Sequence, residues 1–389
     1  MSRRAALIVL DGLGVGAAHD AAAYGDLGSA TLGNVVRAEP GGLRLPNLEA
    51  LGLGCCGDTG LQIVSSPTAA HGVAEPGSPG KDSTTGHWEL CGVILDAPFP
   101  TFPKGFPQVV IDDFAARTGR GVLGNVAASG TAILDQYGTE HLASGKWIVY
   151  TSADSVFQVA AHEDLVPLVE LYAACQTARE LLVGPHGVSR VIARPFRGVP
   201  GAWQRTALRK DFSSQPVGET LLDRLAAMYV PVVGVGKVDD LFAGRGITSI
   251  HTPTNREAYE LIEGAMLAMR RGLLFANVIE FDQSWGHRND VAGYRAGLEE
   301  LDRWIPRLLR QIQDDDLIIF TADHSNDPTT PSTDHAREQV PLLMVGPRVR
   351  PASVGVRSTF ADVGQTIAEF LGVPPLAAGT SFLSEIWTG

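Results

Sequence analysis

Residues 5–14 read AALIVLDGLG, an uninterrupted apolar run that ends at Asp11 and its neighbouring glycines. Similar short apolar runs recur at residues 230–235, 273–281, 317–320 and 340–345. Continuous rather than alternating hydrophobicity is typical of strands buried on both faces, as in a parallel sheet between helices. We predict helices in between, at residues 256–270, 291–313 and 359–371. This alternation of strand and helix indicates an α/β fold.

The middle of the chain has a different pattern. Between residues 100 and 216, turns that contain Pro and Gly separate shorter elements, including a predicted helix at 165–182 and a strand at 190–196. Four prolines between residues 98 and 107 mark one border, and the Pro-Val-Gly sequence at 216–218 marks the other. We therefore predict a core domain formed by residues 1–99 and 217–389, with an α+β domain inserted at residues 100–216.

The composition narrows the class of protein. Of the 389 residues, 44% are hydrophobic and 19% are charged, which excludes intrinsic disorder. The formal net charge of −12 argues against nonspecific binding to nucleic acid or to an anionic membrane surface. The four cysteines lack the paired spacing of a zinc knuckle or a disulfide framework, and no apolar stretch reaches the ~18 residues of a membrane span. We expect a cytoplasmic protein with reduced thiols.

Acidic residues and histidines follow three of the apolar runs. Asp11 follows the first, Asp282 and His287 follow the run at 273–281, and Asp323-His324 follows the run at 317–320, with Asp334-His335 in the next loop. A single Asp at a strand end is usually a helix cap or a turn former. Three strands that deliver such residues to one edge, where α/β sheets bind ligands, are hard to explain as caps. Mixed Asp and His ligands suit Mn²⁺, Zn²⁺ or Mg²⁺, and seven such ligands fit two metals better than one.

A candidate nucleophile lies in the sequence GKDSTTGHW at residues 80–88. It follows residues 65–80, which we predict to be a surface loop because they are rich in Ser, Pro and Gly. If a helix begins here, its N-terminal amides would face a phosphate. The alternative is an ordinary helix cap. A metal ion beside a serine hydroxyl would activate it for phosphoryl transfer.

Longer strings closely resemble the phosphopentomutase family, two-manganese mutases of the alkaline phosphatase superfamily. Besides Asp11 and residues 80–88, they are FDQSWGHRND at 281–290, TADHSNDP at 321–328, TDHARE at 333–338, IVYTSADSVFQVAAHE at 148–163, RVIARPF at 190–196 and VGKVD at 235–239. The resemblance covers essentially the whole chain. It implies an alkaline-phosphatase-like core, with a mostly parallel sheet between helices, and an inserted α+β cap domain that binds the substrate.

The resemblance also implies roles for single residues. Ser83 takes the position of the nucleophile, where the family usually has Thr. One metal would be bound by the Ser83 hydroxyl with Asp11, Asp323 and His324. The other would be bound by Asp282, His287 and His335. In the cap, Ser152 and Asp154 match residues that hold the pentose. Candidate phosphate ligands are Arg190, Arg205, Arg209 and Lys237.

The implied reaction interconverts ribose 1-phosphate, and 2-deoxyribose 1-phosphate, with the 5-phosphates. It would proceed through phosphorylated Ser83 and a 1,5-bisphosphate, and would link nucleoside salvage to the pentose phosphate pathway. The implied cofactors are two Mn²⁺ per chain, with Mg²⁺ or Co²⁺ as substitutes, and a bisphosphorylated sugar such as glucose 1,6-bisphosphate as activator. The expected partners are small pentose phosphates, with no nucleic acid, membrane or obligate protein partner.

Three alternatives remain open. A metal-dependent sugar-phosphate phosphatase would use the same site with poorer exclusion of water. A cofactor-independent phosphoglycerate mutase belongs to the same superfamily but is typically much longer and lacks the string TSADSVFQ. A non-catalytic sugar-phosphate-binding paralog would explain departures in the inserted domain, although every implied metal ligand is present.

The chain departs from the family pattern in both predicted domains. In the insertion, NVAAS at 125–129 replaces a common NKPAS through Val126 and Ala127, and Ala207-Leu208 replaces a common Pro-Asn. These changes remove a Lys and an Asn near the expected substrate face. In the core, the departures are Glu280 for a usual Asp, Ser325 for Gly, Ser332 for a frequent Gly and Ala336 for Thr. Because no implied metal ligand is lost, we expect two-metal chemistry to survive.

Overall fold

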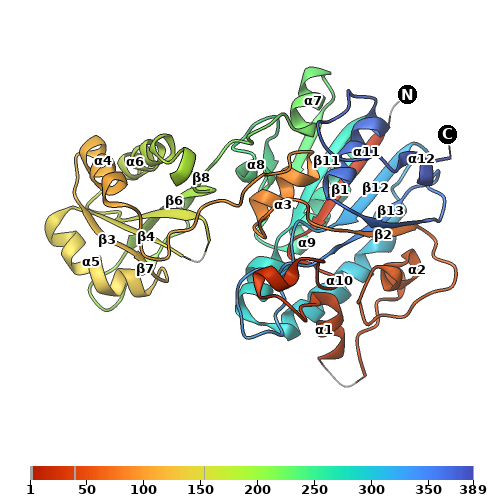
Figure 1. Cartoon of the computed structure of the whole chain (residues 1–389), viewed down its shortest axis with the longest axis horizontal. Coiled ribbons are helices and arrows are strands. Elements are labelled where there is room, and N and C mark those ends of the chain that lie inside the picture. Colours follow the sequence, from red (N-terminus) through yellow and green to blue (C-terminus); the bar gives the residue numbers. More distant parts are fainter. Residues whose placement is uncertain (1–2, 39–40, 153, 389) are drawn as a thin grey trace. The chain divides into compact units, whose positions relative to one another are not determined.

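The computed structural model describes residues 3–38, 41–152 and 154–388. Its contacts divide the chain into two compact units (Figure 1). The core unit is formed by Met1–Pro98 and Pro216–Gly389, and the inserted unit by Phe99–Gln215. A proline therefore stands at each of the two points where the chain passes between the units.

The core unit is built on an eight-stranded sheet in the order β10-β9-β11-β1-β12-β13-β2-β14. Its centre consists of three parallel neighbours, β11 (Gly272–Val278), β1 (Arg4–Leu10) and β12 (Asp316–Thr321). Every residue of these three strands is buried, which confirms the interpretation of their continuous apolar runs. The outer strands are β9 (Val232–Val235), β10 (Ser249–Ile250), β13 (Val340–Val345), β2 (Ala70–Ala74) and β14 (Ser353–Arg357).

Two parts of this sheet differ from the expectation. The prediction of a surface loop at 65–80 was wrong at β2, which pairs with β13 and β14 and is mostly buried. The prediction missed this strand because its residues, AHGVA, do not form an apolar run. Its small residues instead allow the neighbouring backbone to pack closely, since a Cβ at Gly72 would lie 2.6 Å from the Gly355 carbonyl oxygen. In addition, β11 ends at Val278, and Phe281 begins a π-helical turn that runs to Trp285 instead of extending the strand.

The predicted helices of the core unit are present, with ends that differ from the prediction by up to four residues. They are α9 (Asn255–Ala268), α10 (Val291–Leu309) and α11 (Ala361–Leu371). The other helices are α1 (Thr31–Arg37), α2 (Pro46–Leu51), α3 (Ser83–Leu90), α7 (Leu221–Ala227), α8 (Val238–Leu241) and α12 (Leu383–Ile386). One group packs around α10 with α1, α2 and α9, and another around α11 with α3 and α7 (Figure 1). The predicted α/β core, with a mostly parallel sheet between helices, is confirmed.

The inserted unit contains a smaller mixed sheet in the order β3-β4-β5-β6-β7, with β8 also paired to β6. The strands are β3 (Val122–Ala127), β4 (Trp147–Thr151), β5 (Val156–His162), β6 (Arg190–Arg197), β7 (Gln204–Arg205) and β8 (Lys210–Ser213). On one face, α4 (Gln108–Thr118) and α6 (Leu168–Leu181) enclose an apolar core, and α5 (Ala132–Ser144) packs in a second cluster with β4. The helix expected at 165–182 and the strand expected at 190–196 are therefore present.

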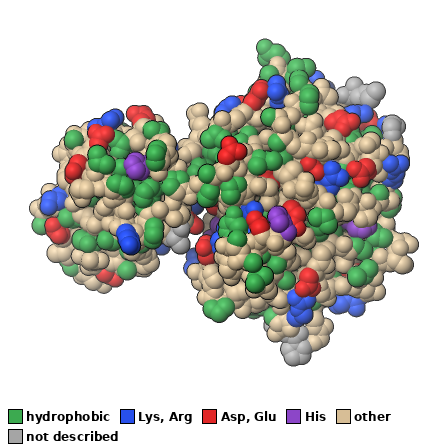
Figure 2. Space-filling view, viewed as in Figure 1, with side chains coloured by type: hydrophobic (Ala, Val, Ile, Leu, Met, Phe, Trp, Pro, Cys, Tyr) green, Lys and Arg blue, Asp and Glu red, His purple; other side chains and the backbone are tan. Residues whose placement is uncertain are grey.

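Two further features are the apolar character of the helices and the distribution of charged side chains on the surface. Within the described residues, no helix combines the length and the apolar character that a membrane span requires. The faces drawn in Figure 2 carry acidic and basic side chains interspersed with polar and apolar ones.

Candidate metal centre

The three central strands place their carboxyl ends side by side. Asp11 follows β1, Asp323 and His324 follow β12, and Asp282 lies in the turn after β11. The Asp11 backbone amide donates to the Val278 carbonyl, so β1 and β11 stay paired up to the acidic residue. The three aspartates are at most 4% exposed. Their convergence is a direct result of the parallel order β11-β1-β12.

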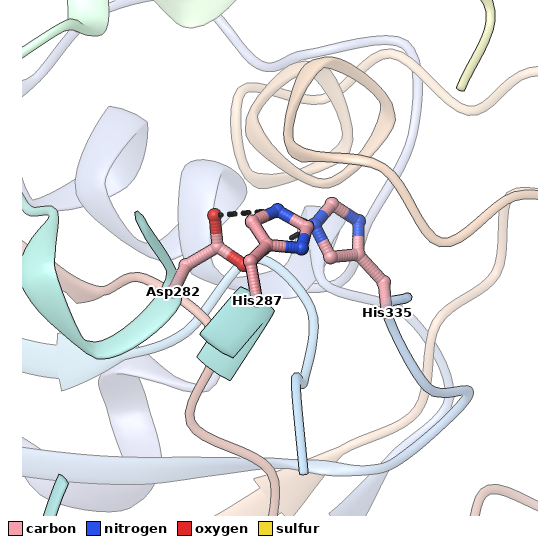
Figure 3. Close-up of side chains that lie close together, drawn as sticks. All are labelled: Asp282, His287 and His335. Carbon is pink, nitrogen blue, oxygen red and sulfur yellow. Dashed lines mark hydrogen bonds and ion pairs between the residues drawn. The ribbon is translucent and has the colours of Figure 1, made fainter. Parts of the chain in front are cut away.

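A first cluster joins Asp282, His287 and His335, whose candidate ligand atoms lie within 4.8 Å of one another (Figure 3). The Nε2 atoms of His287 and His335 lie 3.3 and 3.2 Å from the Asp282 carboxylate oxygens. Each ring donates its Nδ1–H to a backbone carbonyl, of Thr333 for His287 and of Lys81 for His335. This bond fixes the tautomer and directs Nε2 at the cluster, as in metal-binding histidines.

A second cluster joins Asp11, Asp282 and His324 within the same 4.8 Å limit. The His324 Nε2 atom lies 3.2 Å from Asp11 Oδ1 and 3.4 Å from Asp323 Oδ2. Asp282 is therefore common to both clusters, whereas the resemblance assigns it to one metal only. Asp323, which the resemblance assigns to the metal of Asp11, lies beside this cluster through His324 and does not belong to it.

The buried carboxylates support a cation at this edge of the sheet. The carboxylate oxygens of Asp11 and Asp323 are inaccessible to solvent. They lie beside Lys237, whose Nζ atom is 2.7 Å from Asp11 Oδ2, and beside the imidazoles of His324 and His87. Three buried carboxylates so close together are costly unless further positive charge compensates them. Carboxylate and imidazole donors are the set that Mn²⁺, Zn²⁺ or Mg²⁺ accepts. The residues present therefore fit divalent cations.

The crowding of acidic groups also changes the protonation of their neighbours. Burial opposes the charge on His324, but the Asp323, Asp11 and Asp282 carboxylates outweigh it and raise its pKa to about 10. Burial also acts to raise the pKa of Asp11, but the Lys237 ammonium and His324 bring it below its usual value. The cluster thus has a strong preference for positive charge.

Ser83 is the first residue of α3, and Asp82 caps this helix. The Asp82 carboxylate accepts hydrogen bonds from the Thr85 amide at 3.0 Å and from the Thr85 hydroxyl at 2.6 Å. The Ser83 hydroxyl instead lies 3.0 Å from His324 Nε2. The structure therefore distinguishes these two hydroxyls: Thr85 is engaged in the cap, and Ser83 faces the cluster. The helix N-terminus adds partial positive charge at the same place.

Lys237, predicted to bind phosphate, lies against the metal centre. Its Nζ atom is 2.7 Å from Asp11 Oδ2. Burial acts to lower the pKa of Lys237, but Asp11 and Asp282 raise it above its usual value, so the ammonium stays charged. Lys237 thus pairs with an expected metal ligand in this structure, and its contact with phosphate stays a prediction.

The other predicted substrate residues belong to the inserted unit. Asp154 lies 3.7 Å from the Arg190 guanidinium, and Arg190 and Arg209 lie 3.6 and 2.6 Å from Asp211. Ser152 directly follows β4, and Arg205 ends β7. Asp154, Arg190 and Arg209 therefore form a charged group with Asp211 within the inserted unit.

Sequence reasoning missed three residues that hold the proposed site together. His87 Nδ1 lies 2.9 Å from the Ser83 carbonyl and 3.0 Å from Asp323 Oδ2, and its position four residues after Ser83 was a usable signal. Asn326 donates to Asp282 Oδ1 at 2.8 Å. The buried Arg337 guanidinium donates to the Pro76, Ser78 and Gly80 carbonyls of the loop before α3. The contacts of Asn326 and Arg337 join segments that are far apart in the chain, so no local sequence pattern predicts them.

The chain is similar to proteins of known class. A sequence profile described as Metalloenzyme superfamily matches residues 3–375. The chain is 51% identical to a phosphopentomutase of Caldanaerobacter subterraneus subsp. tengcongensis over 391 residues, which cover 99% of this chain and 98% of that protein. It is 54% identical to a phosphopentomutase of Anaeromyxobacter dehalogenans strain 2CP-1, over 99% and 100% of the two chains. A solved phosphoglycerate mutase of Leishmania mexicana is 12% identical, with a TM-score of 0.46 over 100% and 98%.

Proposed function

The chain belongs to the phosphopentomutase family of the Metalloenzyme superfamily, and from this premise we propose that it interconverts the 1-phosphates and 5-phosphates of ribose and 2-deoxyribose. Members of this family are isomerases. The observation that carries the proposal is the position of the Ser83 hydroxyl at a helix N-terminus, 3.0 Å from His324 Nε2 and beside the buried Asp/His clusters. A nucleophile in such a place is suited to accept and return a phosphoryl group.

Phosphorylated Ser83 is the starting state of the proposed cycle. The 5-hydroxyl of ribose 1-phosphate attacks the phosphorus, the bond from phosphorus to Ser83 Oγ breaks, and the hydroxyl proton passes to Ser83 Oγ. The product is ribose 1,5-bisphosphate. After the bisphosphate reorients, Ser83 Oγ takes the phosphoryl group from O1, and the Ser83 proton passes to O1 to give ribose 5-phosphate. The phosphoryl group is conserved, and water takes no part.

The proposed cofactors are two divalent cations, with Mn²⁺ preferred and Mg²⁺ or Co²⁺ as substitutes. When bound, they supply positive charge that offsets the charge of the transferring phosphoryl group and lowers the pKa of a neighbouring hydroxyl. One would be held by Asp11, Asp323 and His324, and the other by Asp282, His287 and His335. Priming by glucose 1,6-bisphosphate follows from the cycle, because unphosphorylated Ser83 has no phosphoryl group to donate.

The inserted unit is proposed to bind the sugar phosphate and to exclude water. Ser152 and Asp154 would hold the pentose. Arg190, Arg205 and Arg209, with Lys237 of the core unit, would bind phosphate. Exclusion of water matters because hydrolysis of phosphorylated Ser83 would end the cycle. We place this activity in the cytoplasm, between nucleoside salvage and the pentose phosphate pathway, with no macromolecular partner.

Replacement of Ser83 tests the proposal. Ser83→Ala should abolish both the phosphorylated enzyme and isomerisation, because no other group stores the phosphoryl between the half-reactions. Ser83→Thr should keep substantial activity, since it restores the residue usual in the family. The measurement is peptide mapping at acid pH after priming with glucose 1,6-bisphosphate, together with ribose 5-phosphate formation. Phosphate on Thr84 or Thr85, or isomerase activity in Ser83→Ala, would refute the assignment.

The products of the reaction distinguish the proposed mutase from the alternative, a sugar-phosphate phosphatase. Ribose 1-phosphate is incubated with the Mn²⁺-loaded enzyme after priming with glucose 1,6-bisphosphate, and both ribose 5-phosphate and free phosphate are measured. A mutase yields ribose 5-phosphate with little free phosphate. Stoichiometric release of phosphate without ribose 5-phosphate would instead establish hydrolysis.

A further inference from the structure

One face of the sheet in the inserted unit gathers arginines. Side chains alternate along β6, so Arg190 and Arg194 share one face while Val191 and Ala193 enter the apolar core under α4 and α6. Ile192, between the two arginines, is in register with Gln158 of β5 and Asp211 of β8, which brings these two polar residues to the arginine face. Further members follow from register and spacing: Arg205 opposite Phe196, and Arg209 two residues before Asp211.

The acidic partners on this face are fewer than the arginines. Asp211 pairs with Arg190 and Arg209, and Asp154 pairs with Arg190. Arg194 donates its Nε–H to the neutral Gln158 side chain at 3.0 Å. Within the described part of the chain, neither Arg194 nor Arg205 forms an ion pair with a carboxylate. Among the described residues, Arg194 and Arg205 therefore bring two positive charges to this face without an ion pair, in a protein whose net charge is −12.

The positive charge of Arg194 opposes folding, because its guanidinium is largely removed from solvent. Its guanidinium is largely enclosed, and burial together with the positive charges of Arg209 and Arg205 lowers its pKa to about 10, although Tyr150 and Asp211 act in the opposite direction. The Tyr150 phenol lies on the same face, and burial raises its pKa against the effect of the same arginines. A cation kept in such surroundings without an acidic partner does not improve folding. Its surroundings are, however, complementary to an anion.

We propose that Arg194 is a further phosphate-binding residue, and that the arginine face takes the dianionic phosphate of the sugar substrate. This inference rests on the proposed function. A phosphate monoester carries nearly two negative charges at neutral pH, which matches the two positive charges of Arg194 and Arg205. A guanidinium also presents paired N–H donors whose geometry fits phosphate oxygens. Arg194 thus joins Arg190, Arg205 and Arg209, and Gln158 orients it through Nε.

Arg194→Met tests the inference, with Arg197→Met as the matched control. Arg197 lies on the same strand, but it points to the other face, is 65% exposed and pairs with Glu163. The unphosphorylated Mn²⁺-loaded enzyme is titrated with ribose 5-phosphate in a calorimeter. Arg194→Met should weaken its binding at least tenfold, roughly the loss of one charge-assisted contact. Arg197→Met should leave the affinity unchanged, and Arg194→Lys should restore part of it.

Two further readouts separate binding from a structural role. Arg194→Met should keep the affinity for Mn²⁺ and should keep or raise the Tm, because it removes a desolvated charge from a crowded cationic face. Unchanged affinity for ribose 5-phosphate in Arg194→Met, or the same loss in both Met variants, would overturn the inference. If Arg194→Met fails to fold, the comparison uses Arg194→Gln and Arg194→Lys. Failure of the proposed function would appear separately, as wild-type enzyme that binds ribose 5-phosphate but forms no ribose 1-phosphate from it.

Discussion

The imidazoles of His287 and His335 show how single residues prepare this site. Each uses one ring nitrogen to bind a backbone carbonyl and directs the other at Asp282 (Figure 3). Asn326, which lies in the segment after β12, donates a hydrogen bond from its side-chain amide to Asp282 Oδ1 at 2.8 Å. These bonds reduce the reorganisation needed when a cation binds.

Asn326→Ala should weaken metal binding. The loss of its bond to Asp282 frees the carboxylate to rotate, and such changes typically lower metal affinity by about 10- to 100-fold. The measurement is a calorimetric titration of the metal-free protein with Mn²⁺. Asn34→Ala is the matched control, because Asn34 donates to the neighbouring Asp327, outside both clusters, at 2.7 Å. Equal Mn²⁺ affinity in the two variants would contradict this role for Asn326.

Two departures from the family pattern have partners of their own. The Glu280 carboxylate accepts from the Asn255 amide at the start of α9, and the Glu280 amide donates back to the Asn255 side chain. The buried Ser325 hydroxyl donates to the Ala336 carbonyl at 2.8 Å. Neither contact involves a ligand atom of the clusters.

At the scale of the elements, the start of α3 decides where the nucleophile lies. Asp82 terminates the loop with extended backbone geometry and caps the helix through Thr85, which places Ser83 in the first turn. Arg337 holds the preceding loop by its carbonyls. The position of Ser83 therefore depends on both a local cap and a distant arginine.

Asp82→Ala should destabilise α3 and misplace Ser83. Loss of an N-cap typically costs about 1 kcal/mol. Asp82→Asn retains an acceptor for the Thr85 amide and should keep most of the stability. The measurement combines thermal unfolding with the yield of phosphorylated enzyme after priming. Full phosphorylation of a destabilised Asp82→Ala protein would show that the cap does not position Ser83.

The helix α5 carries a pH-sensitive contact of the inserted unit. His141 donates Nδ1–H to the Lys146 carbonyl, and its Nε2 accepts from the His162 amide of β5. Burial lowers the pKa of His141, although the Lys146 carbonyl acts in the opposite direction. The neutral ring is thus the form that fits, because a proton on Nε2 would remove the acceptor for His162.

Acidification should therefore loosen the contact between α5 and β5. A depressed folded-state pKa gives a stabilising contribution that is complete above the unfolded-state value of about 6.5 and is lost as the pH falls through the lower folded value. Hydrogen exchange of the β5 amides, corrected for the intrinsic rate, should become faster from pH 6.5 downward. His141→Gln does not titrate and should show a flatter profile. An identical pH dependence in both proteins would contradict the assignment.

At the scale of the whole molecule, the core unit concentrates buried acidic groups at one edge of its sheet. Asp11, Asp282 and Asp323 are buried there, with Lys237 beside Asp11 and with His324 beside Asp11 and Asp323. Mutual repulsion of such charges opposes folding. Bound cations should therefore contribute to the stability of this unit as well as to catalysis.

Removal of metal should lower the Tm and abolish isomerisation. At about one hundred times its Kd, a bound ion stabilises the folded state by about 2.7 kcal/mol. Mn²⁺ should restore the Tm and the activity better than Ca²⁺, because imidazole nitrogen is a poor ligand for a large, hard cation. Differential scanning calorimetry and elemental analysis provide the measurements. Full turnover in excess chelator, with metal absence confirmed, would contradict the two-metal proposal.

The central strands, the principal helices and the grouping of Asp and His residues at one sheet edge could all be predicted from the amino-acid sequence. This was possible because β1, β11 and β12 are buried on both faces, which demands continuous apolar runs that end where the ligand residues begin. Motifs such as residues 80–88 are continuous in the sequence, so their resemblance to a family can be recognised from the sequence alone.

Contacts between residues far apart in the chain could not be predicted in this way and became visible in the folded structure. The strand β2 has no apolar run, and its place between β13 and β14 depends on close backbone packing at Gly72. The sharing of Asp282 by two clusters, the pairing of Lys237 with Asp11 and the excess charge around Arg194 likewise depend on distances between remote segments. Local patterning cannot encode such distances, because they are set by strand order and register.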